Sequence, residues 1–194
     1  MTTHEATHAF VGYWLGDDTA KKMGRLTLNP LKHIDPILSL LLPLSLALIG
    51  APVFGAARPV PYNPNNVRGG DWGAALIAIA GPFANFVLAF LSFGVLALVG
   101  DSSGQTIVGN FFATMTVINL GFFIFNLIPI PPLDGSRLLY ALAPDFFRDW
   151  LLKAERYGII IVFAIILIAG NQFDYFLSNA ISFFIQLFSH IFAF

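Results

Sequence analysis

Long runs of apolar residues alternate with short polar stretches along the whole sequence. A transmembrane helix needs about 20 apolar residues, so a run of that length predicts a membrane span. The shorter run at 157–170 predicts either a helix extended at its N-terminal end or a re-entrant segment. The pattern therefore predicts an all-α, polytopic integral membrane helix bundle of about five to six apolar segments, at 1–15, 36–57, 72–99, 106–128, 157–170 and 174–194.

Prolines and glycines interrupt this pattern at defined places. Pro43 and Pro52 predict kinks or breaks inside the second apolar run. Residues 58–71 are rich in Pro, Asn and Gly, which is typical of a loop. The run at 106–128 ends at the sequence PIPPLDG, where missing backbone donors end a helix. The bundle is therefore expected to contain a proline-broken span and an extended loop.

The composition agrees with a membrane location. Of the 194 residues, 57% are hydrophobic and only 11% are charged, and a soluble domain of this length has too little interior for so much apolar side chain. With a net charge of −1 and no basic run, nothing in the sequence suggests a nucleic-acid partner, and none is expected. The absence of cysteine excludes disulfides, thiolate zinc sites and cysteine nucleophiles. Ionisable residues are thus expected either at a membrane face or at a functional site.

One such group lies near the start of the chain, where residues 4–8 read His4-Glu5-Ala6-Thr7-His8. On a helix, residues four apart lie on one face, so two imidazoles can hold one zinc ion. The carboxylate of Glu5, next to the first histidine, can then take a proton from a water activated by the metal. The pattern therefore predicts a zinc hydrolase centre, although a pair of solvated histidines at the membrane interface would produce the same sequence pattern.

A catalytic zinc ion takes three protein ligands and keeps one position for water. Neither His33, in a polar loop, nor His190, near the C-terminus, is well placed by its spacing alone. Asp134 is the better candidate, because it follows the proline-rich break directly and Gly135 gives the backbone freedom after it. Asp134 could also cap the helix that follows, and the two roles do not exclude each other.

Together these features resemble the site-2 protease family, which comprises zinc metalloproteases that cut peptide bonds within or beside the membrane. The resemblance rests on the H-E-x-x-H at 4–8 and on Pro-Pro-Leu-Asp-Gly at 131–135. Residues 24–36 (GRLTLNPLKHIDP), 54–61 and 81–85 (GPFAN) also match its compact prokaryotic branch, which has no PDZ or nucleotide-sensing domain. The match runs from His4 to about Pro144, and residues 1–144 are therefore interpreted as the membrane-embedded metalloprotease core. Residues 145–194 would add an amphipathic segment and further transmembrane helices.

The resemblance implies a site and a reaction. His4, His8 and Asp134 would bind one zinc ion per chain, with Glu5 as the general base. Asn126 matches an asparagine that lies close to the family's site, and it is expected to be a polar contact to the substrate or the oxyanion. Asn85 matches the asparagine of the family's G-x-x-x-N motif, which implies a contact with the substrate backbone, although each asparagine could equally serve helix packing. The substrate would be a membrane-spanning or membrane-tethered protein, cut inside a lipid bilayer.

Residues 58–63 (RPVPYN) suggest how a substrate could be held. A helical substrate hides its carbonyls in internal hydrogen bonds, so it must be extended before cleavage. An extended, proline-interrupted segment could offer one edge for pairing with it. An ordinary surface loop would have the same composition.

Two further expectations concern the chain as a whole. Residues 1–15 would form a helix of only about 22 Å, so the first helix is expected to be truncated. The location is expected to be multi-pass in a prokaryotic cell membrane, and the sequence leaves orientation and oligomeric state open. The alternatives to a protease are a catalytically inactive membrane-embedded homologue and a metal- or proton-conducting membrane protein.

Overall fold

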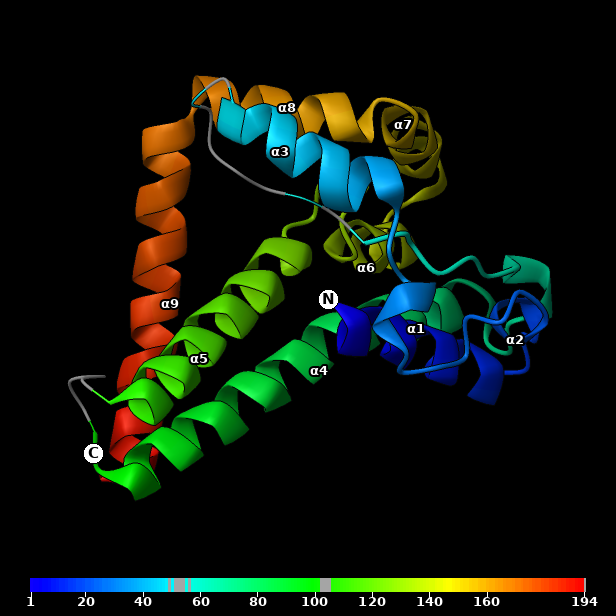
Figure 1. The fold of residues 1–194 in the computed structure, drawn as a ribbon. Coiled ribbons are helices and arrows are strands. Elements are labelled where there is room, and N and C mark those ends of the chain that lie inside the picture. The colour runs from blue at the N-terminus through cyan, green and yellow to red at the C-terminus, as the bar shows by residue number, and fades with distance from the viewer. Residues whose placement is uncertain (49, 51–54, 56, 102–105, 194) are drawn as a thin grey trace. The chain divides into compact units, whose positions relative to one another are not determined.

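A computed structural model describes residues 1–48, 50, 55, 57–101 and 106–193 (Figure 1). Every regular element in these ranges is helical, and they contain no strand. Three short turns are the 3₁₀ turns η1 (Pro30–Lys32) and η3 (Pro64–Asn66) and the π-helical turn η2 (Pro36–Leu41). The α-helices are α1 (Thr2–Trp14), α2 (Thr19–Lys22), α3 (Leu42–Leu48), α4 (Gly70–Val99), α5 (Ile107–Leu127), α6 (Gly135–Leu142), α7 (Asp145–Glu155), α8 (Gly158–Ile168) and α9 (Gly170–Phe192).

The predicted all-α membrane architecture is confirmed. Within the described residues, three helices are long and apolar enough to cross a membrane, namely α4, α5 and α9. The apolar runs at 1–15, 36–57 and 157–170 contain shorter helices. Pro43 is the second residue of α3, which directly follows the π-helical turn η2. It therefore lies where the chain changes from a π-helix to an α-helix. Pro52, a predicted kink, and residues 54 and 56 of the matching segment 54–61 lie outside the described residues.

The chain divides into two compact units, residues 1–81 and 82–194. The first unit contains α1, α2, α3 and the loops around them, and the second contains α5 to α9. The helix α4 contributes residues to both units. The functional division into 1–144 and 145–194 rests on the sequence match, and it stays a prediction.

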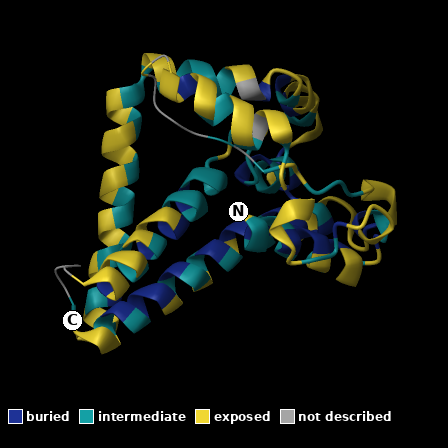
Figure 2. Cartoon of the chain, in the orientation of Figure 1, coloured by how far each residue is buried: buried dark blue, intermediate teal, exposed yellow. Residues whose placement is uncertain are grey.

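Phenylalanine rings form the core of the second unit. Phe188 of α9 is completely buried, and its ring centroid lies 5.2 Å from Phe90 and 5.7 Å from Phe86 and Phe93 of α4. Leu120 of α5, also completely buried, belongs to the same cluster. Figure 2 shows how buried positions recur along α4, while much of α9 is exposed. Such exposure suits a helix that faces lipid, because a membrane helix need not bury its apolar side chains in protein.

Phe188→Ala is expected to lower the free energy of unfolding by about 3 kcal/mol, because it leaves a cavity among rings that cannot close around it. Phe183→Ala removes the same atoms from a neighbouring position of α9 that is 61% exposed, so it is the matched control. The measurement is unfolding in mixed detergent micelles followed by circular dichroism. Equal stability of the two variants would contradict this account of the core.

Candidate active site

The helix α1 brings the two motif histidines together on one face. His4 and His8 are both buried, and their ring centroids lie 4.6 Å apart with the ring planes almost perpendicular. This closeness follows from the i, i+4 spacing on a helix that runs without interruption from Thr2 to Trp14. The pairing of the imidazoles predicted from the sequence is therefore present in the first unit.

A backbone carbonyl sets the orientation of the second imidazole. His8 Nδ1 lies 2.6 Å from the carbonyl oxygen of Ile77, in the first part of α4. A carbonyl oxygen can only accept, so the proton of the neutral ring sits on Nδ1 and the lone pair sits on Nε2. A histidine that ligates a metal through one nitrogen commonly donates from the other in this way. The sequence gives no sign of this contact, because any residue at position 77 supplies the same carbonyl.

Gly81 keeps the space beside the two imidazoles open. A Cβ atom at this position would overlap Nε2 of His8 and would lie 2.8 Å from Cε1 of His4. No side chain fits there without moving the rings. The glycine of the 81–85 motif therefore has a steric reason, and it leaves a cradle next to the nitrogen that carries the lone pair.

Glu5 is held by the extended loop. Its Oε2 accepts a hydrogen bond of 3.0 Å from the backbone N–H of Val60. Residues 57–63 contain no helix, as the composition of this loop predicts. One oxygen of the carboxylate is thus fixed by a neutral donor, which orients the group without the charge of a salt bridge.

Asp134 lies in the second unit, at the residue that precedes α6. It occupies the capping position, but its side chain makes no capping hydrogen bond to α6. Gly135 is required directly after it, since a Cβ there would overlap the carbonyl oxygen of Leu127 and lie 2.7 Å from that of Ile128. The turn at the end of α5 therefore packs too tightly against the start of α6 for any other residue.

The two asparagines are both engaged within the second unit. Asn126 is half-buried and donates from Nδ2 to the carbonyl of Phe122, one turn back in α5, at 2.9 Å. Asn85 of α4 is only 1% exposed and donates to Oδ1 of Asn119 of α5 at 2.8 Å. The sequence did not single out Asn119, which becomes visible only once α4 and α5 are paired. The substrate contacts of Asn126 and Asn85 stay predictions.

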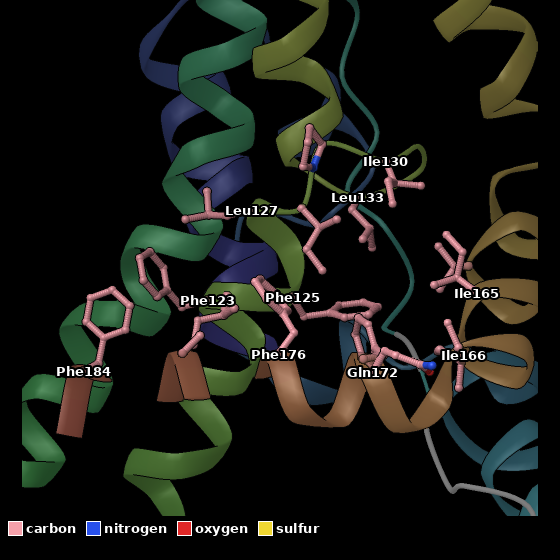
Figure 3. Close-up of a pocket in the computed structure, with 17 residues that line it drawn as sticks. Phe123, Phe125, Leu127, Ile130, Leu133, Ile165, Ile166, Gln172, Phe176 and Phe184 are labelled. Carbon is pink, nitrogen blue, oxygen red and sulfur yellow. The ribbon is translucent and has the colours of Figure 1, made fainter. Parts of the chain in front are cut away.

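An apolar pocket of ≈ 560 Å³ lies in the second unit between the end of α5, the turn after it, α8 and α9 (Figure 3). Leu133, which precedes Asp134, belongs to its wall. Gln172 is the one polar side chain in a lining of aromatic and aliphatic residues. This pocket can hold apolar groups, but its own side chains supply no acid, base or metal ligand.

An all-helical chain with three helices of membrane-spanning length and an H-E-x-x-H helix is typical of a membrane-embedded metallopeptidase. Comparison with known proteins agrees. Residues 100–170 match the family model described as peptidase family M50. No solved structure matches the chain.

Two relatives illustrate the similarity. "Putative zinc metalloprotease YwhC" of Bacillus subtilis (strain 168) is 42% identical over 167 residues, which are 83% of this chain and 73% of that protein. "Putative zinc metalloprotease Rip2" of Mycolicibacterium smegmatis is 33% identical over 169 residues, which are 86% of this chain and 63% of that protein. The chain belongs to peptidase family M50, the family of the membrane-embedded site-2 proteases. The resemblance stated from the sequence motifs is thereby confirmed.

Gly81→Ala is expected to reduce the zinc retained by the purified chain at least tenfold, because the added methyl group displaces both imidazoles. Gly12→Ala is the matched control in the same unit, since a Cβ at Gly12 would lie 3.6 Å from Ile77 Cδ1, an ordinary contact. Zinc is measured by elemental mass spectrometry after gel filtration. Equal zinc in both variants would show that Gly81 does not preserve a metal cradle.

Proposed function

We propose that this protein is a zinc-dependent intramembrane endopeptidase that hydrolyses peptide bonds of membrane-spanning or membrane-tethered proteins. The observation that carries the proposal is the helix α1, which pairs His4 with His8 and presents Glu5 one residue after the first of them. Membership of peptidase family M50, together with relatives named zinc metalloproteases, supports the same reaction.

In this proposal His4, His8 and Asp134 hold one zinc ion per chain. Two imidazoles and a carboxylate form a donor set that is typical of catalytic zinc, which keeps a fourth position for water or substrate. The protonated Nδ1 of His8, facing the carbonyl of Ile77, and the cradle at Gly81 both fit a metal bound at Nε2. Zinc, when bound, lowers the pKa of water toward about 7 and polarises the scissile carbonyl.

Glu5 acts as the general base. Its Oε2 is held by the N–H of Val60, so the carboxylate has a fixed orientation before substrate arrives. The carboxylate takes a proton from the attacking water and then returns it to the leaving amine. A single residue thus serves as base and then as acid, and the amine leaves as a neutral group.

Asn126 is the proposed polar contact to the substrate or to the developing oxyanion. Its Nδ2 carries two hydrogens, and one of them is used by the carbonyl of Phe122. The second hydrogen can be donated to a substrate oxygen without breaking that bond. Asn85 was predicted to contact the substrate as well, but its burial and its bond to Asn119 favour a role in pairing α4 with α5.

The proposed setting is the lipid bilayer of a prokaryotic cell membrane. The named relatives come from bacteria, and three apolar helices of spanning length suit a multi-pass protein. The substrate would meet the site as a segment that has left its helical form, because a helix buries its peptide carbonyls in internal hydrogen bonds.

Glu5→Gln is expected to leave the zinc content unchanged and to reduce cleavage by at least 10³-fold, since the amide cannot accept the proton. The assay uses purified protein in liposomes with a panel of tagged single-pass membrane peptides, read by mass spectrometry of the products. Cleavage by Glu5→Gln at the wild-type rate would contradict the role of Glu5. Metal-dependent zinc or proton flux in the same liposomes without any cleavage would instead indicate a conducting protein.

Asp134→Ala is expected to weaken zinc binding at least tenfold, because one of three ligands is lost. The matched control is Asp145→Ala, whose side chain lies at the start of α7 and is fully exposed. Zinc affinity is measured by competition with a chelating dye, which reports the metal site without any cleavage assay. Unchanged affinity in Asp134→Ala would remove this residue from the proposed ligand set.

A further inference from the structure

The extended loop and the residues after it are hydrogen-bonded at three points to α1 and to the residues just after α1. Near its start, the N–H of Val60 donates to Glu5 in α1. Further on, the N–H of Asn63 donates to Oδ2 of Asp17 at 3.0 Å, just after α1 ends. The N–H of Arg68 then donates to the carbonyl of Leu15 at 2.8 Å. In Figure 1 this part of the chain runs to the turn η3, which lies near α2.

Asp17 is the central group of this attachment. The residue is 1% exposed, so its carboxylate is withdrawn from water. Its Oδ1 accepts from the N–H and the hydroxyl of Thr19, at 3.2 and 2.6 Å, and from Nδ2 of Asn66 at 3.3 Å. Its Oδ2 accepts from Asn63. A buried carboxylate is stable only when donors satisfy it, and these four donors are neutral.

The same hydrogen bonds determine the ionisation state of Asp17. Burial alone raises the pKa of its carboxyl group, but the hydrogen bonds from Thr19, Asn63 and Asn66 outweigh that effect and hold the pKa below its usual value. Asp17 is therefore ionised at neutral pH and acts purely as an acceptor toward the loop.

The loop is stiff on both sides of Val60. Pro59 and Pro61 have fixed φ angles, and each also restricts the residue before it, which is Arg58 or Val60. Only two residues, Pro61 and Tyr62, separate Val60 from Asn63, so the two Cα atoms are at most about 11 Å apart. A displacement of Asn63 is thus carried to Val60, because few free dihedral angles lie between them to absorb it.

Two backbone N–H groups near the start of the loop point to the same side of the chain. The N–H of Arg58 donates to the carbonyl of His33 at 2.9 Å, and that of Val60 donates to Glu5. Successive residues of an extended chain point to opposite sides, and the residues between and after these two are prolines, which have no N–H. The N–H groups of Arg58 and Val60 thus both point away from solvent, and they hold the loop against the 24–36 segment and α1.

We infer that Asp17 is a positioning residue for the proposed general base: its carboxylate holds Asn63, and through the stiff loop it keeps the N–H of Val60 on Oε2 of Glu5. Asp17 lies twelve residues after Glu5 in the sequence and outside the H-E-x-x-H motif. It touches neither substrate nor metal in this account, which rests on the proposed function of Glu5. Its effect is on the orientation of the carboxylate and hence on the rate of proton transfer.

The decisive variant is Asp17→Asn, which keeps the size of the side chain but turns one acceptor into a donor that faces the N–H of Asn63 or the amide of Asn66. Three properties are measured: zinc content, deuterium uptake of the 58–66 peptide, and kcat against KM for a cleaved membrane peptide. We expect unchanged zinc, at least tenfold faster exchange in 58–66, and a kcat reduced at least tenfold with KM within twofold. Because Pro59, Pro61 and Pro64 have no amide, the signal comes from few residues that include Val60.

Two controls separate positioning from general support of the fold. Asp18→Asn changes the neighbouring aspartate, which is half-buried and forms an ion pair with Lys22 at 2.8 Å, and it should leave all three properties unchanged. Thr19→Ala removes a hydroxyl bond to Asp17 but leaves the bond to Asn63, so it should also leave kcat within twofold. If Thr19→Ala lowers kcat as much as Asp17→Asn does, the role is structural and the inference is overturned.

The remaining outcomes each decide the question. Should Asp17→Asn fail to fold, Asn66→Ala removes a bond that ties the loop segment itself to Asp17, which Thr19→Ala does not, and it should raise exchange in 58–66 and lower kcat about threefold. Unchanged exchange in 58–66 in the folded variant overturns the inference whatever the cleavage assay shows. If the wild-type protein cleaves no membrane peptide, the proposed function fails, while the exchange comparison still tests the contact between Asp17 and the loop.

Discussion

The hydrogen bond between His8 Nδ1 and the carbonyl of Ile77 is the contact on which the proposed chemistry depends. It fixes the tautomer, because a carbonyl can only accept, and it therefore fixes which nitrogen can bind a metal. It also requires the first part of α4 to lie directly against α1. That approach is possible because Gly81 has no side chain to collide with the two imidazoles. One backbone contact thus joins the packing of two helices to the chemistry of the ring.

Backbone groups also hold two carboxylates of the first unit. Glu5 and Asp17 are both bound by backbone N–H groups of a single extended loop. Neutral donors of this kind orient a carboxylate while leaving its charge available, whereas a salt bridge would offset part of it. Prolines give the loop the stiffness that such a role needs. The two carboxylates thus lie in or just after one helix, and one loop holds both.

The sequence predicted a substantial part of this arrangement. Long apolar runs predicted the helical membrane bundle, and the H-E-x-x-H motif predicted that His4 and His8 share a face. The rest depended on contacts between distant backbone groups, which carry no residue signature. The carbonyl of Ile77 and the N–H of Val60 belong to residues that any apolar side chain could replace. The match at Gly81 was visible in the sequence, but its reason became clear only with the imidazoles beside it.

The central claim is that α1 supplies two imidazole ligands to a catalytic zinc ion. X-ray absorption at the zinc edge of the purified protein tests this claim most directly, since it reports the ligands of the metal itself. The account predicts a four-coordinate zinc ion with two imidazole nitrogens at about 2.0–2.1 Å and the remaining ligands oxygen. A zinc ion without imidazole scattering, or with the same spectrum after His8→Ala, would contradict it.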